Sequence, residues 1–501
     1  MKPLLSLAAL IALFGSPAYA QEKPVNLLII TADDMNGDAP GWMGNPLKTT
    51  PHLDAFAVTA HQFINQHVTA PICQPSRSAF MTGRVPHVNG ALGFDPVREG
   101  TPSLVTILKA RGYFAGVIDK HVHMQPESVF PWDRKLQGSG KNPPLRKQHM
   151  QELLAAAKDS GKPFFINANI TDPHRPFPGS AQEATRRGGR KAANADDEAQ
   201  DNQPRRAARP KQASRAAKAA GNASPESLDT RVVTAQEVRT PRFLEDLPDI
   251  RTETAQYETA IARLDVSFGV ILEALQEAGH EGDTIVVFFS DHGISMPFSK
   301  ATVYRNGTWS PVLMRIPGMG TPQVRPEFVS SVDLVPTLLE LLKVERPDGM
   351  NGRSWLGLLK GETQHDRDFV VTHVNTTSSG ANHAQRCIRT KNHALMFHAW
   401  TNGEPKFKVE AMNGLTFAAL AKAGETDARI AARVAQYQVG QPLMFFDEML
   451  DPDERENRID DSTRKTEIER LAALLIDHMQ RTNDPLLKDF QKALDLWRMR
   501  S

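Results

Sequence analysis

Acidic residues occur in two short stretches of this 501-residue chain where they could bind a metal ion. Asp33 and Asp34 are adjacent, and Asp291 lies far along the chain in Asp291-His292-Gly293. Carboxylate oxygens are hard ligands, and they suit Ca²⁺ or Mg²⁺. A single aspartate would be read as a turn residue or helix cap, but several aspartates brought together predict a metal site.

Three short apolar runs predict the elements that position these residues. The runs are residues 25–31, 164–170 and 284–290, and each has the composition of a strand buried on both faces. The polar stretches that follow them are Asp33-Asp34, Asp172-Pro173-His174 and Asp291-His292-Gly293. Open α/β sheets bind ligands beyond the carboxyl ends of their strands, so we expect these stretches to meet.

The alternation of strands and helices predicts a layered α/β domain. Between two of the runs, apolar residues from Ile261 to Leu275 recur at helical spacing, and Gly279 is a plausible C-terminal stop. From about His365 the pattern changes to shorter strands, 369–373 and 394–398, and a helix-rich end that includes 468–479. We predict a catalytic domain over residues 21–365 and a smaller α+β domain over 366–501.

The first twenty residues predict an exported protein. Lys2 is followed by a nearly continuous apolar run from Leu4 to Phe14 and then by Ala18-Tyr19-Ala20, the pattern of a cleaved secretory signal peptide. The run is short for a membrane anchor. Removing residues 1–20 leaves 58 Lys+Arg against 58 Asp+Glu, since only Lys2 is lost from 59. A periplasmic or secreted protein with no integral membrane segment and no nucleic-acid partner is expected.

Residues 181–220 differ from the rest of the chain. Ala, Arg, Lys, Gln and Asn dominate, without aromatic or branched aliphatic residues. Such a segment buries too little apolar surface to offset the entropy of ordering, so we predict a disordered basic insertion. It could contact an anionic polysaccharide, although a solvated loop is the simpler interpretation.

Cys73 lies in the most specific motif of the sequence. The chain has two cysteines, Cys73 and Cys387, which could form a disulfide in an oxidising compartment. However, residues 73–84 read Cys-Gln-Pro-Ser-Arg-Ser-Ala-Phe-Met-Thr-Gly-Arg, about forty residues after the Asp pair. This combination resembles the signature of the sulfatase family, in which a formylglycine-generating or sulfatase-maturing enzyme oxidises the cysteine to formylglycine (3-oxoalanine).

The resemblance implies a covalent mechanism. Hydrated formylglycine is a geminal diol, in which one oxygen attacks sulfur and the other later helps to expel sulfate. The implied metal ligands are Asp33, Asp34, Asp291, His292 and residue 73, with Ca²⁺ expected and Mg²⁺ the alternative. His292 stands where many sulfatases carry Asn, and imidazole is a softer ligand than an amide oxygen. The implied fold is alkaline-phosphatase-like: a large mixed, mostly parallel sheet between helices, with a smaller C-terminal domain.

The resemblance also implies which side chains act on the sulfate. Arg77, Lys120 and Lys300 match the cations that neutralise it. The catalytic histidine after Lys120 is His121 or His123, and we favour His123. The glycine usual before that lysine is replaced by Asp119. His174 matches the residue that protonates the leaving atom.

Several stretches look like the heparan N-sulfatase (sulfamidase) branch of the family. They are residues 116–133, 172–175, 263–265, 291–294 and 446–457. The likeness implies release of inorganic sulfate from a sulfated carbohydrate, such as a glycosaminoglycan unit. Residues 376–389, including His383 and Arg386, are expected to approach the sugar. The sequence leaves open whether the sulfate is O-linked or N-linked and whether the protein is a homodimer.

Two other functions remain open from the sequence. A phosphodiester or phosphonate ester hydrolase of the same superfamily could use a similar site. A non-catalytic protein that binds sulfated glycans could retain the fold with Cys73 unmodified, and residues 181–220 would then be its electrostatic arm. A pure binder needs neither the Asp pair nor the modification motif, which argues against this second alternative.

Overall fold

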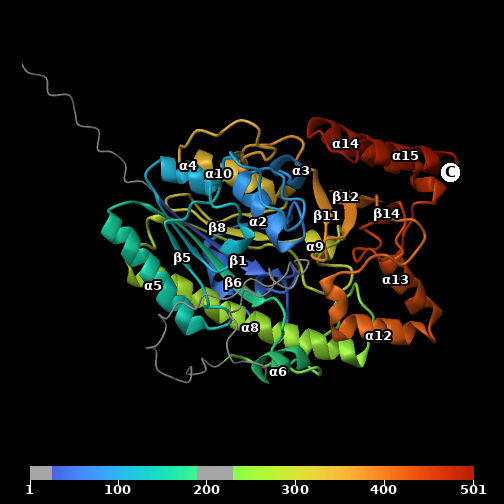
Figure 1. Cartoon of the computed structure of the whole chain (residues 1–501), viewed down its shortest axis with the longest axis horizontal. Helices are drawn as coiled ribbons and strands as arrows, with labels where there is room; N and C mark the ends of the chain where they lie inside the picture. The colour runs from blue at the N-terminus through green and yellow to red at the C-terminus, as the bar shows by residue number, and fades with distance from the viewer. Residues whose placement is uncertain (1–24, 189–229, 501) are drawn as a thin grey trace, which may run out of the picture.

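The computed structural model describes residues 25–188 and 230–500. Its larger sheet has eight strands in the order β5-β4-β6-β1-β7-β8-β2-β9 (Figure 1). Their bounds are β1 Asn26–Asp33, β2 His61–Phe63, β4 Phe114–Ile118, β5 Arg134–Leu136, β6 Phe164–Pro173, β7 Thr284–Ser290, β8 Val312–Arg315 and β9 Val324–Arg325. The five strands from β5 to β7 are parallel, and β8 runs antiparallel to both of its neighbours. The predicted mixed, mostly parallel sheet is confirmed.

Both faces of the central strands are buried, as their continuous apolar sequences predict. In β1, Leu28 and Ile30 pack on one face and Leu27 and Ile29 on the other. The first face is covered by α1 (Pro51–Thr59), α5 (Pro143–Ser160) and α8 (Pro248–Glu277). The second is covered by α2 (Cys73–Thr82), α4 (Leu104–Ala110) and α10 (Leu334–Leu341). Figure 1 shows α5 and α8 on one side of the sheet and α4 and α10 on the other.

The register of the central strands brings three predicted stretches to one edge. Strand β1 lies between β6 and β7, with Thr31 paired to Asn169 and Ala32 paired to Ser290. A register shift then places Asp33 opposite Pro173. The carboxyl ends of β1, β6 and β7 therefore deliver their polar residues to the same place.

A second, four-stranded antiparallel sheet follows in the order β11-β12-β13-β14. Its strands are β11 Phe369–Thr376, β12 Asn382–Thr390, β13 His393–His398 and β14 Leu443–Asp447, and its helices are α12 Leu415–Gly424, α13 Ala428–Gln438, α14 Lys465–Arg481 and α15 Leu487–Arg498. One face of the sheet, including Met396, packs into the same core as α8. The other face, including Leu395, packs against α14 and α15. The predicted C-terminal strands and helix are confirmed.

The remaining elements are short. They are β3 Gln66–His67, β10 Val329–Ser330, α3 Pro86–Asn89, α9 Arg305–Thr308, α11 Leu356–Leu359, and the 3-10 helices η1 Gly41–Met43, η2 His121–His123, η3 Ser331–Asp333, η4 Glu410–Asn413 and η5 Ser462–Arg464. None of the helices in the described ranges has the length and apolar character needed to cross a bilayer.

The predicted insertion at 181–220 has a wrong boundary. Residues Ala181–Gly188 form helix α6, because Ser180 caps it by accepting a hydrogen bond from the Glu183 backbone N–H at 3.1 Å. The remainder of this prediction, like the predicted signal peptide at 1–20, lies outside the described residues.

Candidate active site

Cys73 begins helix α2 and is buried, with 2% of its surface exposed. Its Sγ lies 3.2 Å from His292 Nε2, and both Cys73 and Cys387 are free thiols. Burial, the largest influence, raises the pKa of the Cys73 thiol well above its usual value. An unmodified Cys73 is therefore a neutral thiol at pH 7 and a poor nucleophile.

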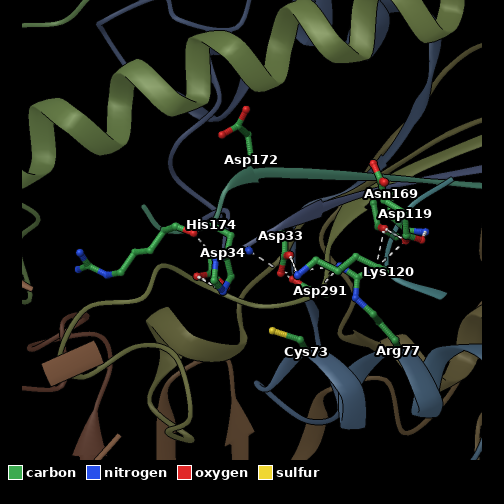
Figure 2. A network of polar contacts seen from close by, with 12 residues as sticks. Asp33, Asp34, Cys73, Arg77, Asp119, Lys120, Asn169, Asp172, His174 and Asp291 are labelled. Carbon is green, nitrogen blue, oxygen red and sulfur yellow. Dashed lines mark hydrogen bonds and ion pairs between the residues drawn. The ribbon is translucent and has the colours of Figure 1, made fainter. Parts of the chain in front are cut away.

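Three further predicted ligands converge beside this thiol. The ligand atoms of Asp33, Asp34, Cys73 and His292 all lie within 4.8 Å of one another, and all four residues are buried. Both carboxylate oxygens of Asp33 and Oδ1 of Asp34 lack a hydrogen bond of ordinary geometry within the described ranges. Figure 2 shows Cys73 facing the two aspartates from α2. Two buried carboxylates that converge with an imidazole and residue 73 are a donor set that fits a divalent cation.

Asp291, the fifth predicted ligand, pairs with a cation in this structure. Arg77 Nη2 lies 2.8 Å from Asp291 Oδ2 and 3.8 Å from Asp33 Oδ1. Arg77 is one helical turn beyond Cys73 and fully buried, so α2 presents both side chains to the same edge of the sheet. The Asp34 backbone N–H donates to Asp291 Oδ1 at 3.3 Å. Asp291 thus lies beside the four-residue cluster and holds Arg77 in place.

Lys120 reaches the same carboxylates from the end of β4. Its Nζ lies 2.5 Å from Asp33 Oδ2. Asp119 and Lys120 both have left-handed backbones, with φ of 54° and 51°, a conformation that costs side-chain-bearing residues about 1 kcal/mol each. The Asp119 carboxylate stabilises the turn, since it accepts hydrogen bonds from the backbone N–H groups of Gly138 (2.9 Å) and Gly140 (3.2 Å) and pairs with Arg146 at 3.3 Å. Aspartate therefore fills the position where the family usually has glycine.

Charge balance sets the ionisation of the two central carboxyls. Burial acts to raise the pKa of Asp33, but Lys120, His174 and Arg77 together hold it well below its usual value. Burial raises the pKa of Asp291, and the negative charge of Asp33 adds to the effect. The surrounding cations therefore stabilise the ionised form of Asp33 more than that of Asp291.

Asn169 is a site residue that the sequence analysis missed. Its buried Oδ1 accepts hydrogen bonds from Arg77 Nη1 at 2.5 Å and Thr31 Oγ1 at 2.6 Å. Its Nδ2 donates to the carbonyls of Ile118 (2.9 Å) and Asp119 (3.1 Å). One amide thus joins helix α2, which carries Arg77, to the Lys120 turn (Figure 2). The available clue was its position, because an amide within an apolar, doubly buried strand requires polar partners.

His174 and Lys300 approach Asp34 from the side away from Arg77 and Lys120. His174 Nδ1 donates to the Arg175 carbonyl at 2.7 Å, so Nε2 faces Asp34 Oδ2 at 3.9 Å. Lys300 Nζ lies 3.1 Å from Asp34 Oδ1. Asp172 points away from the site (Figure 2) and is held by Arg263 through contacts of 2.7 and 2.9 Å, which anchors the strand end that carries His174.

Glu410 is a second residue that the sequence analysis missed. It comes from η4, far along the chain, yet its Oε2 lies 2.9 Å from Lys300 Nζ and its Oε1 lies 3.6 Å from His174 Nε2. Its side chain is 28% exposed, so it lies at the rim of the cluster. Nothing in the local sequence distinguishes this glutamate from a surface residue.

The two candidate histidines after Lys120 have different surroundings. Both lie in η2. His123 is 1% exposed, and its ring meets Phe94 edge-to-face with centroids 5.7 Å apart. His121 is only half-buried, beside the Gln137 amide at 2.9 Å. The preference for His123 stays a prediction.

His383 and Arg386, the predicted sugar-binding residues, are both buried and hydrogen-bonded within the protein. All five donor N–H groups of Arg386 have acceptors, two of them the oxygens of Asp484 at 2.6 and 3.0 Å, and the residue is fully buried. His383 is buried, with its ring nitrogens beside Thr377 Oγ1 and the Lys406 carbonyl, both at 3.2 Å. Both side chains are therefore held by protein groups, and their sugar-binding role stays a prediction.

The layered sheet and its acidic, cation-lined edge define a hydrolase of alkaline-phosphatase-like architecture. Residues 25–344 match the family model described as Sulfatase, and residues 291–406 match the one described as N-sulphoglucosamine sulphohydrolase, C-terminal. The chain belongs to the sulfatase family, and it is a hydrolase of sulfate esters or sulfamates. The predicted family and enzyme class are confirmed.

Known relatives agree with this assignment, and solved structures share the fold. Human N-sulphoglucosamine sulphohydrolase is 29% identical over 393 residues, covering 72% of this chain and 70% of the relative. An ulvan-active sulfatase from Formosa agariphila is 28% identical over 422 residues, covering 74% and 73%. In fold, the chain is similar to a 2-O GAG sulfatase (TM-score 0.63, 20% identity, covering 92% and 93%) and to the phosphonate monoester hydrolase of Agrobacterium radiobacter (TM-score 0.65, 15% identity, covering 91% and 96%).

Proposed function

We propose that this sulfatase releases inorganic sulfate from a sulfated carbohydrate, with formylglycine at position 73 as nucleophile. The observation that carries the proposal is the position of Cys73, buried at the start of α2 and within 4.8 Å of three potential metal ligands. Its raised pKa argues against a thiolate mechanism, and the motif at 73–84 supplies the alternative of a modified residue. The printed names of the relatives, one acting on N-sulphoglucosamine and one on ulvan, support a carbohydrate substrate.

The residues fit a bound divalent cation, which we propose to be Ca²⁺. Asp33, Asp34, His292 and the oxygen of formylglycine at position 73 would hold it, with Asp291 alongside. When bound, such a cation polarises oxygens and stabilises negative charge. Three hard or borderline oxygen donors favour Ca²⁺ or Mg²⁺, and His292 is the softer member of the set.

The cations of this chain have a shared task. Arg77, Lys120 and Lys300 surround Asp33 and Asp34 on three sides, so they can neutralise an entering sulfate and the charge that develops as its S–O or S–N bond breaks. Arg77 is the most rigidly held, since Asp291, Asn169 and Thr31 fix its guanidinium. This rigidity fits a group that must not reorganise during the reaction.

His174 is placed to donate a proton to the leaving atom. Its Nδ1–H is committed to the Arg175 carbonyl, which leaves Nε2 to exchange protons on the site side. Glu410 borders both His174 and Lys300 and can orient them. We propose that an alcohol or an amine leaves here.

We further propose that the protein is exported to the periplasm or secreted. It would be matured by a formylglycine-generating or sulfatase-maturing enzyme. A homodimer is compatible with this proposal.

Mass spectrometry of the peptide around residue 73, followed by kinetics, tests the proposal. We expect formylglycine at this position and turnover of aryl sulfate well above that of aryl phosphate and phosphonate. Because the phosphonate hydrolase shares the fold, a large preference for phosphorus esters would overturn the proposal. A screen of O- and N-sulfated mono- and disaccharides then identifies the leaving group.

A further inference from the structure

A second group of buried metal-ligating side chains lies where the C-terminal sheet meets the catalytic domain. It contains His87 of α3, His373 of β11 and Asp484 of the loop between α14 and α15. Their ligand atoms all lie within 4.8 Å of one another, and all three residues are buried. Figure 1 shows α3 beside β11 and α14. The group shares no residue with the active site.

The hydrogen bond of His87 fixes its tautomer. His87 Nε2 lies 3.1 Å from the Thr482 carbonyl oxygen, which can only accept, so Nε2 carries the proton. A neutral imidazole carries a proton on only one of its two nitrogens. Nδ1 is therefore a bare lone pair. It faces Asp484 Oδ2 at 3.7 Å and has no hydrogen-bond partner in the described part of the chain.

His373 directs its Nδ1 to the same carboxylate oxygen, at 3.8 Å. This Nδ1 is also buried without a hydrogen bond among the described residues. On the other side of the ring, Nε2 lies 3.3 Å from His478 Nε2. When His373 Nε2–H donates to His478, Nδ1 presents a lone pair. Metal-ligating histidines are commonly oriented in this way, by a hydrogen bond from the other ring nitrogen to a group that does not bind the metal.

Asp484 can take part because Arg386 leaves it further lone pairs. Arg386 binds Oδ2 through Nε and Oδ1 through Nη2, and each carboxylate oxygen can accept more than one contact. The paired guanidinium of Arg386, 2.6 Å from Asp484 Oδ2, favours the ionised carboxylate. When His373 donates through Nε2, two imidazole lone pairs and a carboxylate oxygen converge within 4.8 Å of one another, and a bound cation would relieve their mutual repulsion.

We infer that His87 Nδ1, His373 Nδ1 and Asp484 Oδ2 form a binding site for a borderline transition-metal ion of the zinc class. Two nitrogens and one carboxylate oxygen are the donor set that Zn²⁺ and Co²⁺ prefer and that Ca²⁺ does not. Donor atoms around a tetrahedral ion lie about 3.4 Å apart for bond lengths of about 2.1 Å, so small side-chain movements close the observed spacing. The ion would tie α3, next to the nucleophile helix, to the C-terminal sheet.

Metal uptake by the full chain tests the inference. The protein is made in a His292→Ala background, which removes the one imidazole from the active-site cluster, and is stripped with a chelator and resupplied with excess Ca²⁺. Co²⁺ and Zn²⁺ are then titrated, with visible absorption for Co²⁺ and elemental analysis for Zn²⁺. We expect one Zn²⁺ or Co²⁺ per chain and a tetrahedral Co²⁺ spectrum.

Matched variants locate the site. His87→Asn and His373→Asn should weaken binding at least about tenfold, whereas His365→Asn, at an exposed histidine, should leave it unchanged. His87 is at the edge of the core, so His87→Asn is the variant expected to fold if His373→Asn does not. If the gap holds only a water molecule, the protein will bind neither Zn²⁺ nor Co²⁺ in excess Ca²⁺. That result overturns the inference. Equal affinity for Zn²⁺ or Co²⁺ in the His292→Ala protein with and without His87→Asn also overturns the inference.

Discussion

Replacing Asn169 by alanine tests whether the buried amide positions the catalytic cations. The side chain accepts hydrogen bonds from Arg77 and Thr31 and donates to the carbonyls of Ile118 and Asp119. Alanine keeps the strand and removes these four bonds, together with a long 3.4 Å contact from Nδ2 to the Asn167 carbonyl. We therefore expect losses of both stability and activity from one substitution.

The structure gives the size of each loss. Three bonds between neutral groups contribute about 1 kcal/mol each, and the bond to the Arg77 guanidinium contributes about 2 kcal/mol, so the free energy of unfolding should fall by about 5 kcal/mol. The activity loss comes from displaced cations, because Arg77 loses a 2.5 Å contact and the Asp119–Lys120 turn loses its tether. A displacement of about 1 Å in a catalytic group costs about 100-fold, which is the expected fall in kcat/KM.

Asn167→Ala is the matched control. Asn167 lies two residues earlier in β6, on the same face, and is equally buried, but its side chain donates only to the Ile29 carbonyl at 3.2 Å among the described residues. It should lose about 1 kcal/mol of stability and keep kcat/KM within a few-fold. Urea unfolding gives the stabilities, and turnover of an aryl sulfate by equally matured protein gives kcat/KM.

Two results would refute the reasoning. Folded Asn169→Ala with unchanged kcat/KM would show that Arg77 and Lys120 are positioned without the amide. An equal loss of kcat/KM in Asn167→Ala would show that any polar truncation in this strand damages the site.

Three further predictions concern the nucleophile, the acid and a buried carboxyl. Cys73→Ala and Cys73→Ser, made in a host that matures only cysteine, should lose turnover yet keep the wild-type melting temperature; activity in either variant would exclude formylglycine. His174→Ala should slow substrates with poor leaving groups more than activated aryl sulfates, and equal losses in kcat would contradict a proton-donating role. Burial, with Asp38 nearby, raises the pKa of Glu258 to about 8, so the folded state keeps a proton that the unfolded chain releases above its pKa of about 4.3. The free energy of unfolding therefore falls by about 4 kcal/mol as pH rises from 5 to 8. Urea unfolding of Glu258→Gln should lack this fall. The same pH dependence of unfolding free energy in wild type and Glu258→Gln would disprove the prediction.

Local sequence patterns predicted much of the catalytic domain. The runs at 25–31, 164–170 and 284–290 are mostly apolar, as strands buried on both faces require, and all three are central strands. Asp33, Asp34 and Asp291 follow such runs, so strand polarity alone placed them at one edge. Cys73 and Arg77 share a motif whose spacing fits one helical turn, and α2 confirms that spacing.

Other features depended on segments that meet only after folding. Glu410 reaches Lys300 and His174 across more than a hundred residues of chain, and nothing near it in sequence marks it as a site residue. Arg386 looked like a substrate ligand, but the fold buries it against Asp484. A polar residue in a strand has the same sequence signal whether it faces a cleft or another buried ion.

The sequence by itself determined the family and the strand ends and predicted the nucleophile, because these depend on residue type and short-range spacing. The tertiary structure alone decided the partners: Asp291 with Arg77, Asp119 with the turn at Lys120, and His87 with His373 and Asp484. The physical reason is that burial and pairing are properties of neighbours in space. A carboxylate or imidazole acquires its role from the charges and lone pairs that distant segments bring within about 4 Å of it.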